Sequence, residues 1–210
     1  MKLRHYIVAL LLVPILLLLR FVVDIGDRQP GIYTVTRVID GDTVELDGHE
    51  QLRLLGIDTP EYGDLFFEQA KEYLAGLVLH EKVRVELGRR KRDNYGRLLG
   101  YLYLDTIFVN VEIIKQGLGW MYLFSDNPQS QIMLDQLFAA QHLALAEKVG
   151  IWTLPIIMEE EYYIGNVATM RFHRPACRSV QRMSDNNKII FSRPEDAYHE
   201  GYSPCRNCKP

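Results

Sequence analysis

The sequence predicts an α+β protein in which a small closed β-barrel with packed helices is followed by a small metal-binding module. Short segments rich in β-branched residues begin the folded part of the chain, after an apolar N-terminus. Helical spacing interrupts these segments once and returns after them. All three cysteines stand near the C-terminus, where two short-spaced ligand pairs mark the module.

The N-terminal segment is apolar from Tyr6 to Leu19 apart from Pro14, with basic residues before it and Arg20 after it. It is short for a membrane span of about 20 residues, which suits a signal-peptide core. No small-x-small cleavage motif follows, and Arg20 can snorkel to the interface of an uncleaved span. We therefore expect residues 1–30 to be a signal anchor and tether that hold the rest outside the cytoplasm. The alternative is a cleaved signal peptide and a secreted or periplasmic protein.

The barrel region begins with a strand from Tyr33 to Ile39, where β-branched residues alternate. Two further strands, Thr43–Leu46 and Gln51–Leu55, flank Asp47-Gly48, a dipeptide typical of hairpin turns. The sequence therefore predicts a β-hairpin directly after the first strand.

Helices and strands then alternate along the chain. Apolar residues at helical spacing predict a helix from Phe67 to Val78, and strand character returns at Lys82–Leu87 and Leu98–Leu104. Two more helices are expected at 110–116 and 131–148. Strands interrupted by one helix and followed by others favour a small closed barrel with packed helices.

Overall charge gives no support to binding of a polyanion, because the formal net charge is −3 and non-specific nucleic-acid affinity comes mainly from Lys and Arg. The 48% hydrophobic and 24% charged content excludes a disordered chain. One local cluster is strongly basic: Arg89, Arg90, Lys91 and Arg92. It forms either a basic rim beside a nucleic-acid-binding cleft or a solvated loop.

Carboxylates and arginines recur in short motifs of the barrel region. Hydrolysis of a phosphodiester needs a cation near the charged oxygens, a base that orients water, and fixed positive groups on the phosphoryl oxygens. The motifs contain residue types for all three tasks, in Asp40-Gly41-Asp42-Thr43, Arg53, Asp58-Thr59-Pro60-Glu61 and Asn94-Tyr95-Gly96-Arg97.

From about Tyr33 to Trp152 these motifs, in this order and spacing, resemble the staphylococcal nuclease family. The resemblance implies an OB-type five-stranded β-barrel over residues 31–154. It also implies an endonuclease that hydrolyses DNA, with RNA as a further candidate, and leaves 3′-phosphates and 5′-hydroxyls. The matching blocks are Val38–Leu46, Arg53–Glu61, Asp93–Leu98, Val109–Asn110 and Gln116–Leu118.

By the same resemblance, Asp42 and Asp58 are ligands of a catalytic calcium ion, assisted by the backbone carbonyl of Thr59, since hard oxygen ligands favour calcium. Asp40 is expected either to orient metal-bound water or to serve as a turn residue. Glu61 matches the general base, and its alternative role is that of a carboxylate near the start of a helix.

Arg53 and Arg97 match the two arginines that clamp the phosphate, a task suited to a permanently charged group with bidentate donors. Tyr95 resembles a residue that contacts a terminal phosphate, although Asn94 stands where the best-known member has lysine. Tyr122 lies where the family has aromatic residues that stack on a base, with core packing as the alternative.

The C-terminal ligand pairs are His173-x3-Cys177 and Cys205-x2-Cys208. Two short-spaced pairs of this kind suit tetrahedral zinc. A Cys205–Cys208 disulfide with Cys177 free is the alternative. Because a module of about 50 residues has a small core, bound metal would supply folding energy.

Residues 162–210 resemble the metal-binding module of the Ada methyl-phosphotriester repair protein. His173 replaces the first cysteine, so the site lacks the full cysteine set needed to accept a methyl group. We therefore expect a structural or DNA-binding module. Besides the two ligand spacings, the shared features are Tyr163–Asn166, Phe191 and Gly201–Cys205.

Taken together, these patterns favour a calcium-dependent nuclease with a zinc-containing tail. Its expected partners are DNA, RNA as a further candidate, and a membrane through the N-terminal segment; no protein partner is predicted. A non-catalytic nucleic-acid-binding module on the same fold is the main alternative, and an inactive scaffold with a functional zinc module is another. The joint presence of the five motif residues argues against both: Asp42, Arg53, Asp58, Glu61 and Arg97.

Overall fold

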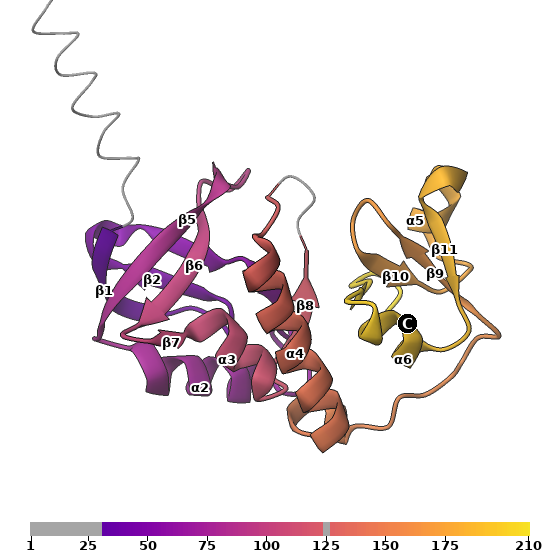
Figure 1. Cartoon of the computed structure of the whole chain (residues 1–210), viewed down its shortest axis with the longest axis horizontal. Helices are drawn as coiled ribbons and strands as arrows, with labels where there is room; N and C mark the ends of the chain where they lie inside the picture. The colour runs from indigo at the N-terminus through magenta and orange to yellow at the C-terminus, as the bar shows by residue number, and fades with distance from the viewer. Residues whose placement is uncertain (1–30, 124–126) are drawn as a thin grey trace, which may run out of the picture. The chain divides into compact units, whose positions relative to one another are not determined.

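The computed structural model describes residues 31–123 and 127–210 (Figure 1). The chain divides into two units, Met1–Gly31 and Ile32–Pro210, and the second contains nearly all of the described elements. The signal anchor or signal peptide and tether expected at residues 1–30 lie outside the described residues. In the described ranges, every helix is too short or too polar to cross a membrane.

A closed β-barrel forms the first half of the described chain. Its strands hydrogen-bond in the order β3-β2-β1-β5-β6, and β3 also pairs with β6 in parallel, which closes the barrel. A short strand, β7, continues the sheet beside β6. The predicted small five-stranded barrel is confirmed, with strands β1 (Gly31–Val38), β2 (Thr43–Leu46), β3 (Gln51–Leu54), β5 (Lys82–Arg92) and β6 (Leu98–Leu104); the additional strand β7 spans Ile107–Phe108.

The predicted hairpin is also present, between β2 and β3. Its turn is a short 3-10 segment, Asp47–His49, in which Gly48 has a φ of 80°, a conformation that glycine adopts without steric cost. The antiparallel register places Thr43 opposite Arg53. The hairpin therefore places the first residue of β2 directly beside Arg53 of β3.

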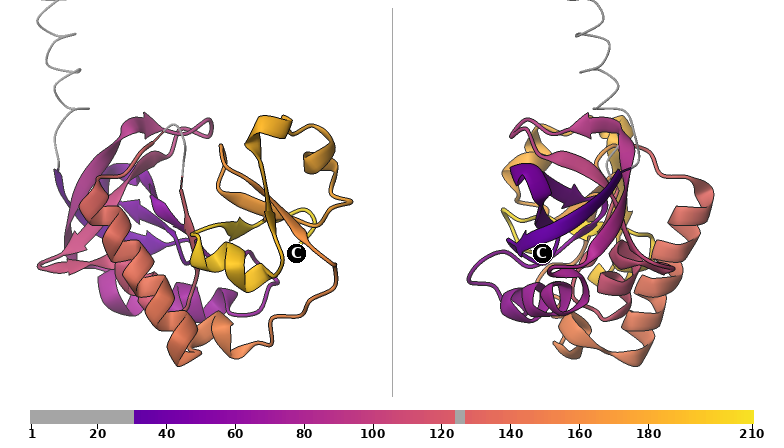
Figure 2. Two further views of the ribbon diagram at one scale, coloured as in Figure 1. Left: turned by 45° about the vertical axis from the view of Figure 1, so that its right-hand side comes forward. Right: turned by 90° about the vertical axis from the view of Figure 1, so that its left-hand side faces the viewer.

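Three helices pack next to the barrel, as Figures 1 and 2 show. They are α2 (Phe67–Val78), α3 (Val109–Lys115) and α4 (Gln131–Glu147), close to the predicted ranges. The α2 residues at helical spacing, among them Ala70 and Leu74, are fully buried in the barrel core. Ser130 caps α4 by accepting a hydrogen bond from the backbone of Met133.

A two-stranded antiparallel pair, β4 (Gly56–Asp58) with β8 (Trp120–Tyr122), lies beside the barrel. Asn110 holds the chain that leads into β4. Its side chain is fully buried, donates to the carbonyl of Leu55 at 2.8 Å and accepts from the backbone of Leu102 at 2.9 Å. The asparagine thereby fixes the segment between Arg53 and Asp58 against β6.

The C-terminal module contains a four-stranded sheet in the order β11-β9-β10-β12. Strand β10 pairs in parallel with β12, and this register sets Arg171 beside Ser203. The module's elements are β9 (Tyr163–Asn166), β10 (Arg171–His173), α5 (Arg178–Gln181), β11 (Lys188–Phe191), α6 (Pro194–His199) and β12 (Ser203–Pro204).

The module and the barrel domain share a hydrophobic cluster. Ala144 of α4 and Trp152 lie in this cluster with Tyr163, Phe172 and other module residues. A buried hydrogen bond joins the same two parts, since the side chain of Gln141 donates to the carbonyl of Tyr198 at 2.6 Å. Residues 32–210 therefore fold as a single compact unit.

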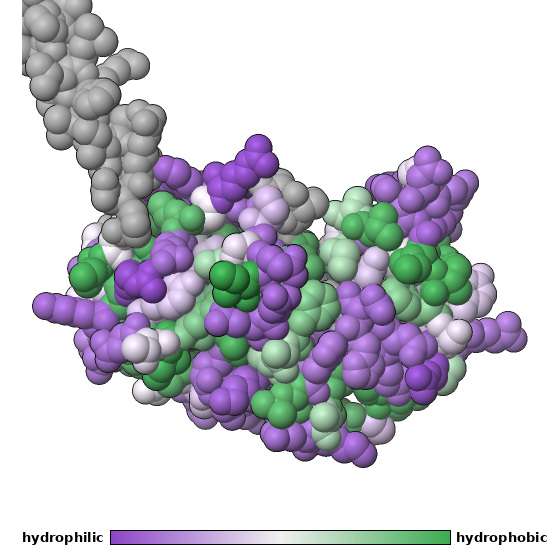
Figure 3. Space-filling model, in the orientation of Figure 1, coloured by the Kyte–Doolittle hydropathy of each residue, from purple (hydrophilic) through white to green (hydrophobic). Residues whose placement is uncertain are grey.

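The surface of the molecule is largely hydrophilic on the face shown in Figure 3. Hydrophobic residues on that face occur in separate groups among the hydrophilic ones.

Candidate active site and metal centre

The turn between β1 and β2 is built around Gly41. A Cβ atom at this position would lie 2.7 Å from the Cβ of Ala70 on α2 and 2.9 Å from Oγ1 of Thr59. The Asp40 side chain accepts the backbone N–H of Asp42 at 3.0 Å. Glycine thus permits the close approach that places two carboxylates on one tight turn.

Asp42 is buried and held by several hydrogen bonds. Its Oδ2 accepts the backbone N–H of Thr59 at 3.0 Å and the hydroxyl of Thr59 at 3.1 Å. Its Oδ1 accepts the hydroxyl of Thr43 at 3.0 Å. These contacts fix the carboxylate in one orientation.

Arg53 joins Asp42 to Asp58. Its Nε lies 2.9 Å from Oδ1 of Asp42 and its Nη2 lies 3.1 Å from Oδ1 of Asp58, and all three side chains are buried. The guanidinium also donates to the carbonyl of Leu54. The fold therefore brings together two carboxylates that are far apart in the sequence.

The pKa of Asp42 is raised to about 7, chiefly because burial disfavours the charged carboxylate. The guanidinium of Arg53 opposes the rise, whereas the charges of Asp40 and Asp58 add to it. A cation bound here would favour the ionised form, and the oxygen ligands are those that hard divalent cations prefer.

A cavity of about 330 Å³ opens beside these carboxylates. Most of the predicted site residues line it, and three further charged residues, Asp93, Arg171 and Arg206, line it with them. The predicted residues among its walls are Asp40, Asp42, Arg53, Asp58, Glu61, Arg97 and Tyr122.

A second and larger cavity, of about 650 Å³, adjoins the first. Both cavities are lined by Asp58, Glu61 and Arg206, so these three side chains stand where the two spaces meet. The walls of the larger cavity include Thr59 and Trp152.

Glu61 and Arg97 face the smaller cavity with different degrees of constraint. The Glu61 side chain is 54% exposed, so water reaches its carboxylate. Arg97 is held by Asp93, with Nε 2.7 Å from Oδ2. Asp93 therefore orients the second arginine, a role that the motif alone did not reveal.

The remaining predicted nucleic-acid contacts lie outside the lining of the smaller cavity. Tyr95 is 87% exposed, and the guanidinium of Arg97 lies 5.6 Å from its ring. The basic cluster 89–92 belongs to β5 instead of a loop; Arg92 pairs with Glu50 at 2.8 Å. A basic rim formed by this cluster stays a prediction.

Two arginines of the C-terminal module reach the site, and neither was predicted from the sequence to do so. Arg206 pairs with Asp58 and with Glu61. Arg171 places Nη2 3.2 Å from Oδ2 of Asp58 and lies 4.1 Å over the ring of Tyr122. The one available signal was that each arginine stands next to, or two residues from, a predicted zinc ligand.

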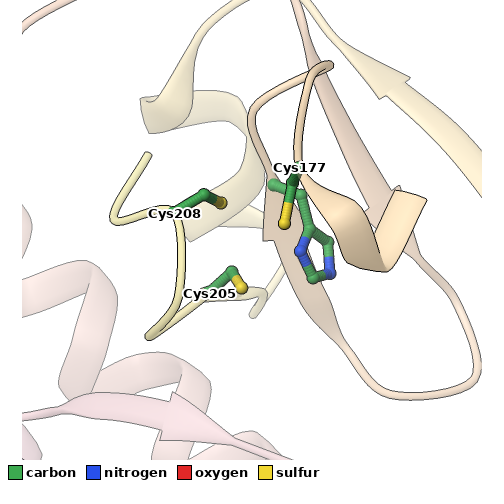
Figure 4. A group of neighbouring side chains, drawn as sticks. Cys177, Cys205 and Cys208 are labelled. Atoms are coloured by element: carbon green, nitrogen blue, oxygen red, sulfur yellow. The ribbon is translucent and has the colours of Figure 1, made fainter. Parts of the chain in front are cut away.

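The predicted zinc ligands converge in the module. The ligand atoms of His173, Cys177, Cys205 and Cys208 all lie within 4.8 Å of one another. Figure 4 shows the three cysteine side chains turned toward a common centre. All three are free thiols, so the alternative Cys205–Cys208 disulfide is not formed.

The chemistry of the cluster fits a metal. Nδ1 of His173 is buried and has no hydrogen-bond partner among the described residues, as expected of a nitrogen that ligates. Burial raises the pKa of Cys208 to about 12, and the nearby Cys205 adds to the rise. A bound cation would be needed to stabilise the thiolate. The backbone N–H of Arg174 donates to the sulfur of Cys208 at 3.4 Å and helps to orient it.

Comparison with known proteins finds a match for the barrel domain and another for the C-terminal module. Residues 51–154 match the family described as staphylococcal nuclease homologue, and residues 157–210 match the metal binding domain of Ada. Thermonuclease of Staphylococcus intermedius is 35% identical over 133 residues, covering 57% of this chain and 75% of that protein. A Haemophilus influenzae protein named uncharacterized endonuclease is 32% identical over 142 residues, covering 65% of this chain and 75% of that protein.

A further relative extends across more of the chain. Endonuclease YhcR of Bacillus subtilis is 27% identical over 201 residues, covering 80% of this chain but 16% of that protein. The closed barrel, the carboxylates joined by Arg53 and these matches lead to one assignment. The chain belongs to the staphylococcal nuclease family and carries an Ada-type zinc-binding module at its C-terminus.

Proposed function

We propose that this nuclease is a calcium-dependent endonuclease that hydrolyses phosphodiester bonds of DNA, with RNA as a further candidate substrate, and leaves 3′-phosphates. One observation carries the proposal. Asp42 and Asp58 are locked together by Arg53 at a cavity that Glu61 and Arg97 also line. Family membership supports the reaction class, since thermonuclease and endonuclease relatives match this part of the chain.

Asp42 and Asp58, with the backbone carbonyl of Thr59, are the groups that would hold calcium. Their oxygen atoms are hard ligands, and the burial of both carboxylates makes a neutralising cation favourable. When bound, calcium would polarise the phosphoryl group and stabilise the charge that develops on it.

The side chains of this site divide the remaining work. Arg53 is already oriented by the two carboxylates and presents a permanently charged donor to a phosphoryl oxygen. Arg97, which Asp93 holds in place, presents a second permanently charged donor to the phosphoryl group. Glu61 orients a water molecule for in-line attack on phosphorus and accepts its proton.

We also propose that the catalytic unit lies outside the cytoplasm, anchored by the N-terminal segment or released after its cleavage. Support comes from the sequence: an apolar run preceded by basic residues stands at the N-terminus.

Replacing Glu61 with Gln will lower the rate of calcium-dependent DNA cleavage about 10²–10⁴-fold, the usual worth of a positioned general base. The measurement is cleavage of single- and double-stranded DNA by full-length protein, with and without added calcium. Strong chelators are avoided because they would also remove zinc. Glu68→Gln is the matched control, since Glu68 is an exposed carboxylate of α2 outside the lining of the smaller cavity.

Two results would contradict the proposal. Cleavage by Glu61→Gln at the parent rate would remove Glu61 from the mechanism. If the parent protein binds DNA but does not cleave it in calcium, the nuclease hypothesis fails and the non-catalytic nucleic-acid-binding module is favoured instead.

Calcium affinity will rise about tenfold from pH 6 to pH 8 and then level off, because the proton on Asp42, with a pKa of about 7, must leave before the carboxylate ligates. The contribution of Asp42 to stability changes with pH in the opposite direction to calcium affinity. The pKa of Asp42 in the folded protein exceeds the ordinary value of 3.8, so in calcium-free protein this group's contribution to the free energy of unfolding falls as pH rises from about 4 to 7.

Titration calorimetry in two buffers of different ionisation enthalpy measures both the affinity and the proton release. Close to one proton per calcium is expected at pH 6 and almost none well above pH 8. Equal affinity and no proton release at pH 6 would show that Asp42 is already ionised before calcium binds.

A further inference from the structure

The nuclease cavity is completed by the zinc-binding module. Arg171 of β10 and Arg206 of the C-terminal turn line the same cavity as the predicted catalytic residues. Both arginines contact Asp58, from which they are 113 and 148 residues distant in the sequence. The module therefore contributes side chains to the site instead of standing apart as a separate tail.

Of the two arginines, Arg206 makes more contacts with the carboxylates of the site. Its guanidinium bridges Asp58 and Glu61, with Nε also 3.3 Å from Oδ2 of Asp58. The arginine thus stands between the carboxylate proposed to bind the cation and the one proposed to activate water. By the proposed function, the scissile phosphodiester would lie between these same two groups.

Charge shows why the additional arginines matter. Among the residues that line the smaller cavity, the barrel domain supplies five carboxylates and two arginines. Such a surface would repel a phosphodiester. The module raises the number of arginines to four. The formal net charge of the chain is −3. The module thus adds two positive groups at the place where a polyanion would bind.

The geometry leaves Arg206 able to hold a phosphate while it stays near the carboxylates. Its side chain is 46% exposed, whereas that of Asp58 is 4% exposed. A guanidinium carries five N–H donors in a fixed fork, and each terminal nitrogen has two of them. Nε and Nη2 face Asp58 and Nη1 faces Glu61, so the second N–H of each terminal nitrogen can reach a phosphate oxygen.

Both arginines stand close in the sequence to residues that would hold zinc. Arg206 directly follows Cys205, and Arg171 stands two residues before His173. Arg171 also donates from Nη1 to the carbonyl of Pro204 at 3.0 Å, which ties the two arginine segments together. A zinc ion held by His173 and Cys205 would thus set the spacing of the arginine pair.

We propose that Arg206 and Arg171 are substrate-binding residues of the nuclease, which hold the phosphodiester backbone of DNA and are positioned by the zinc centre. The inference rests on the proposed function for its substrate. Its test measures binding without cleavage, so that failure of either one can be recognised.

The experiment measures binding of full-length, zinc-loaded protein to a fluorescein-labelled single-stranded DNA, by anisotropy without added calcium. A length of about 12 nucleotides suits a small binding fold, and a gel confirms that the DNA stays intact. Arg206→Ala and Arg171→Ala are compared with Arg182→Ala, which removes the same charge from an exposed position of the module outside the cavity.

Each cavity variant is expected to bind DNA at least about tenfold more weakly, the worth of a charge-assisted hydrogen bond. The salt dependence should lose about 0.7 in log–log slope, one phosphate contact for a single strand. Arg206→Lys should keep the slope but recover only part of the affinity. With neutral methylphosphonate linkages in place of phosphates, the difference between parent and Arg206→Ala should disappear. Arg182→Ala should stay within about twofold of the parent.

Two results would overturn the inference. One is parent-like DNA binding by both Arg206→Ala and Arg171→Ala. The other is tighter calcium binding and faster cleavage by Arg206→Ala, because Arg206 would then block the cation site instead of holding substrate. Zinc content is measured for every variant. If Arg206→Ala loses zinc, Arg206→Gln and Arg171→Ala decide the question. If the parent binds DNA through both arginines but does not cut it, the proposed reaction fails while this inference stands.

Discussion

Replacing Arg53 with Met will lower DNA cleavage at least about 10³-fold and destabilise the fold in calcium-free buffer by about 3–5 kcal/mol. Both effects have the same origin. The buried guanidinium contacts Asp42 and Asp58, and its loss removes a positive charge that partly offsets the burial of Asp42. Cleavage kinetics and denaturant unfolding, each with and without calcium, measure the two effects.

Calcium should restore part of the stability of Arg53→Met, because a bound cation neutralises the same carboxylates, but it should not restore cleavage. Arg37→Met is the matched control. Arg37 is a barrel arginine whose side chain is 62% exposed and pairs with Glu45, so its loss should cost less than about 1 kcal/mol. Unchanged stability of Arg53→Met without calcium would mean that the buried ion pairs contribute nothing net to the fold.

Replacing Cys205 with Ser will reduce bound zinc from about one ion per chain to nearly none, because serine lacks the thiolate that structural zinc sites use. Structural zinc contributes about 10–16 kcal/mol of apparent binding free energy in small domains. The module should therefore unfold locally while the barrel remains. Zinc content, hydrogen exchange over residues 162–210 and limited proteolysis measure this.

The consequences of Cys205→Ser should extend beyond the module. Trp152 and Ala144 share a hydrophobic cluster with module residues, so their protection should fall as well, and DNA binding should weaken with the displacement of Arg206. Thr169→Ala, at an exposed position of the module, is the control and should retain zinc. Retention of a full zinc complement by Cys205→Ser would show that the cysteine is not a ligand.

Local signals predicted most of the fold. Asp47-Gly48 identified the hairpin because the turn depends on the residues that form it. The helical spacing around Leu74 identified α2 because its buried face follows that spacing. Closure of the barrel depends on the parallel pairing of β3 with β6, a long-range contact that propensity does not show. The order of strands and helices favoured a closed barrel, and resemblance to a family specified its five-stranded OB type.

The sites likewise divide into features that local sequence signals predicted and features that depend on long-range contacts. The zinc ligands were predicted because each pair is short-spaced in the sequence. The basic cluster 89–92 was assigned to a rim or a loop, yet β5 continues through it, because Arg92 pairs with Leu98 of β6. Arg171 and Arg206 were missed because their contacts with Asp58 arise only when the module packs onto the barrel domain.

The ion pair between Arg206 and Asp58 would link the two proposed metal sites thermodynamically. Arg206 stands beside a proposed zinc ligand and Asp58 is a proposed calcium ligand, so an ion bound at one site would change the free energy of binding at the other. Such coupling is reciprocal: whatever factor zinc applies to calcium affinity, calcium must apply to zinc affinity. Through this one salt bridge, occupancy of either site by its ion would affect occupancy of the other.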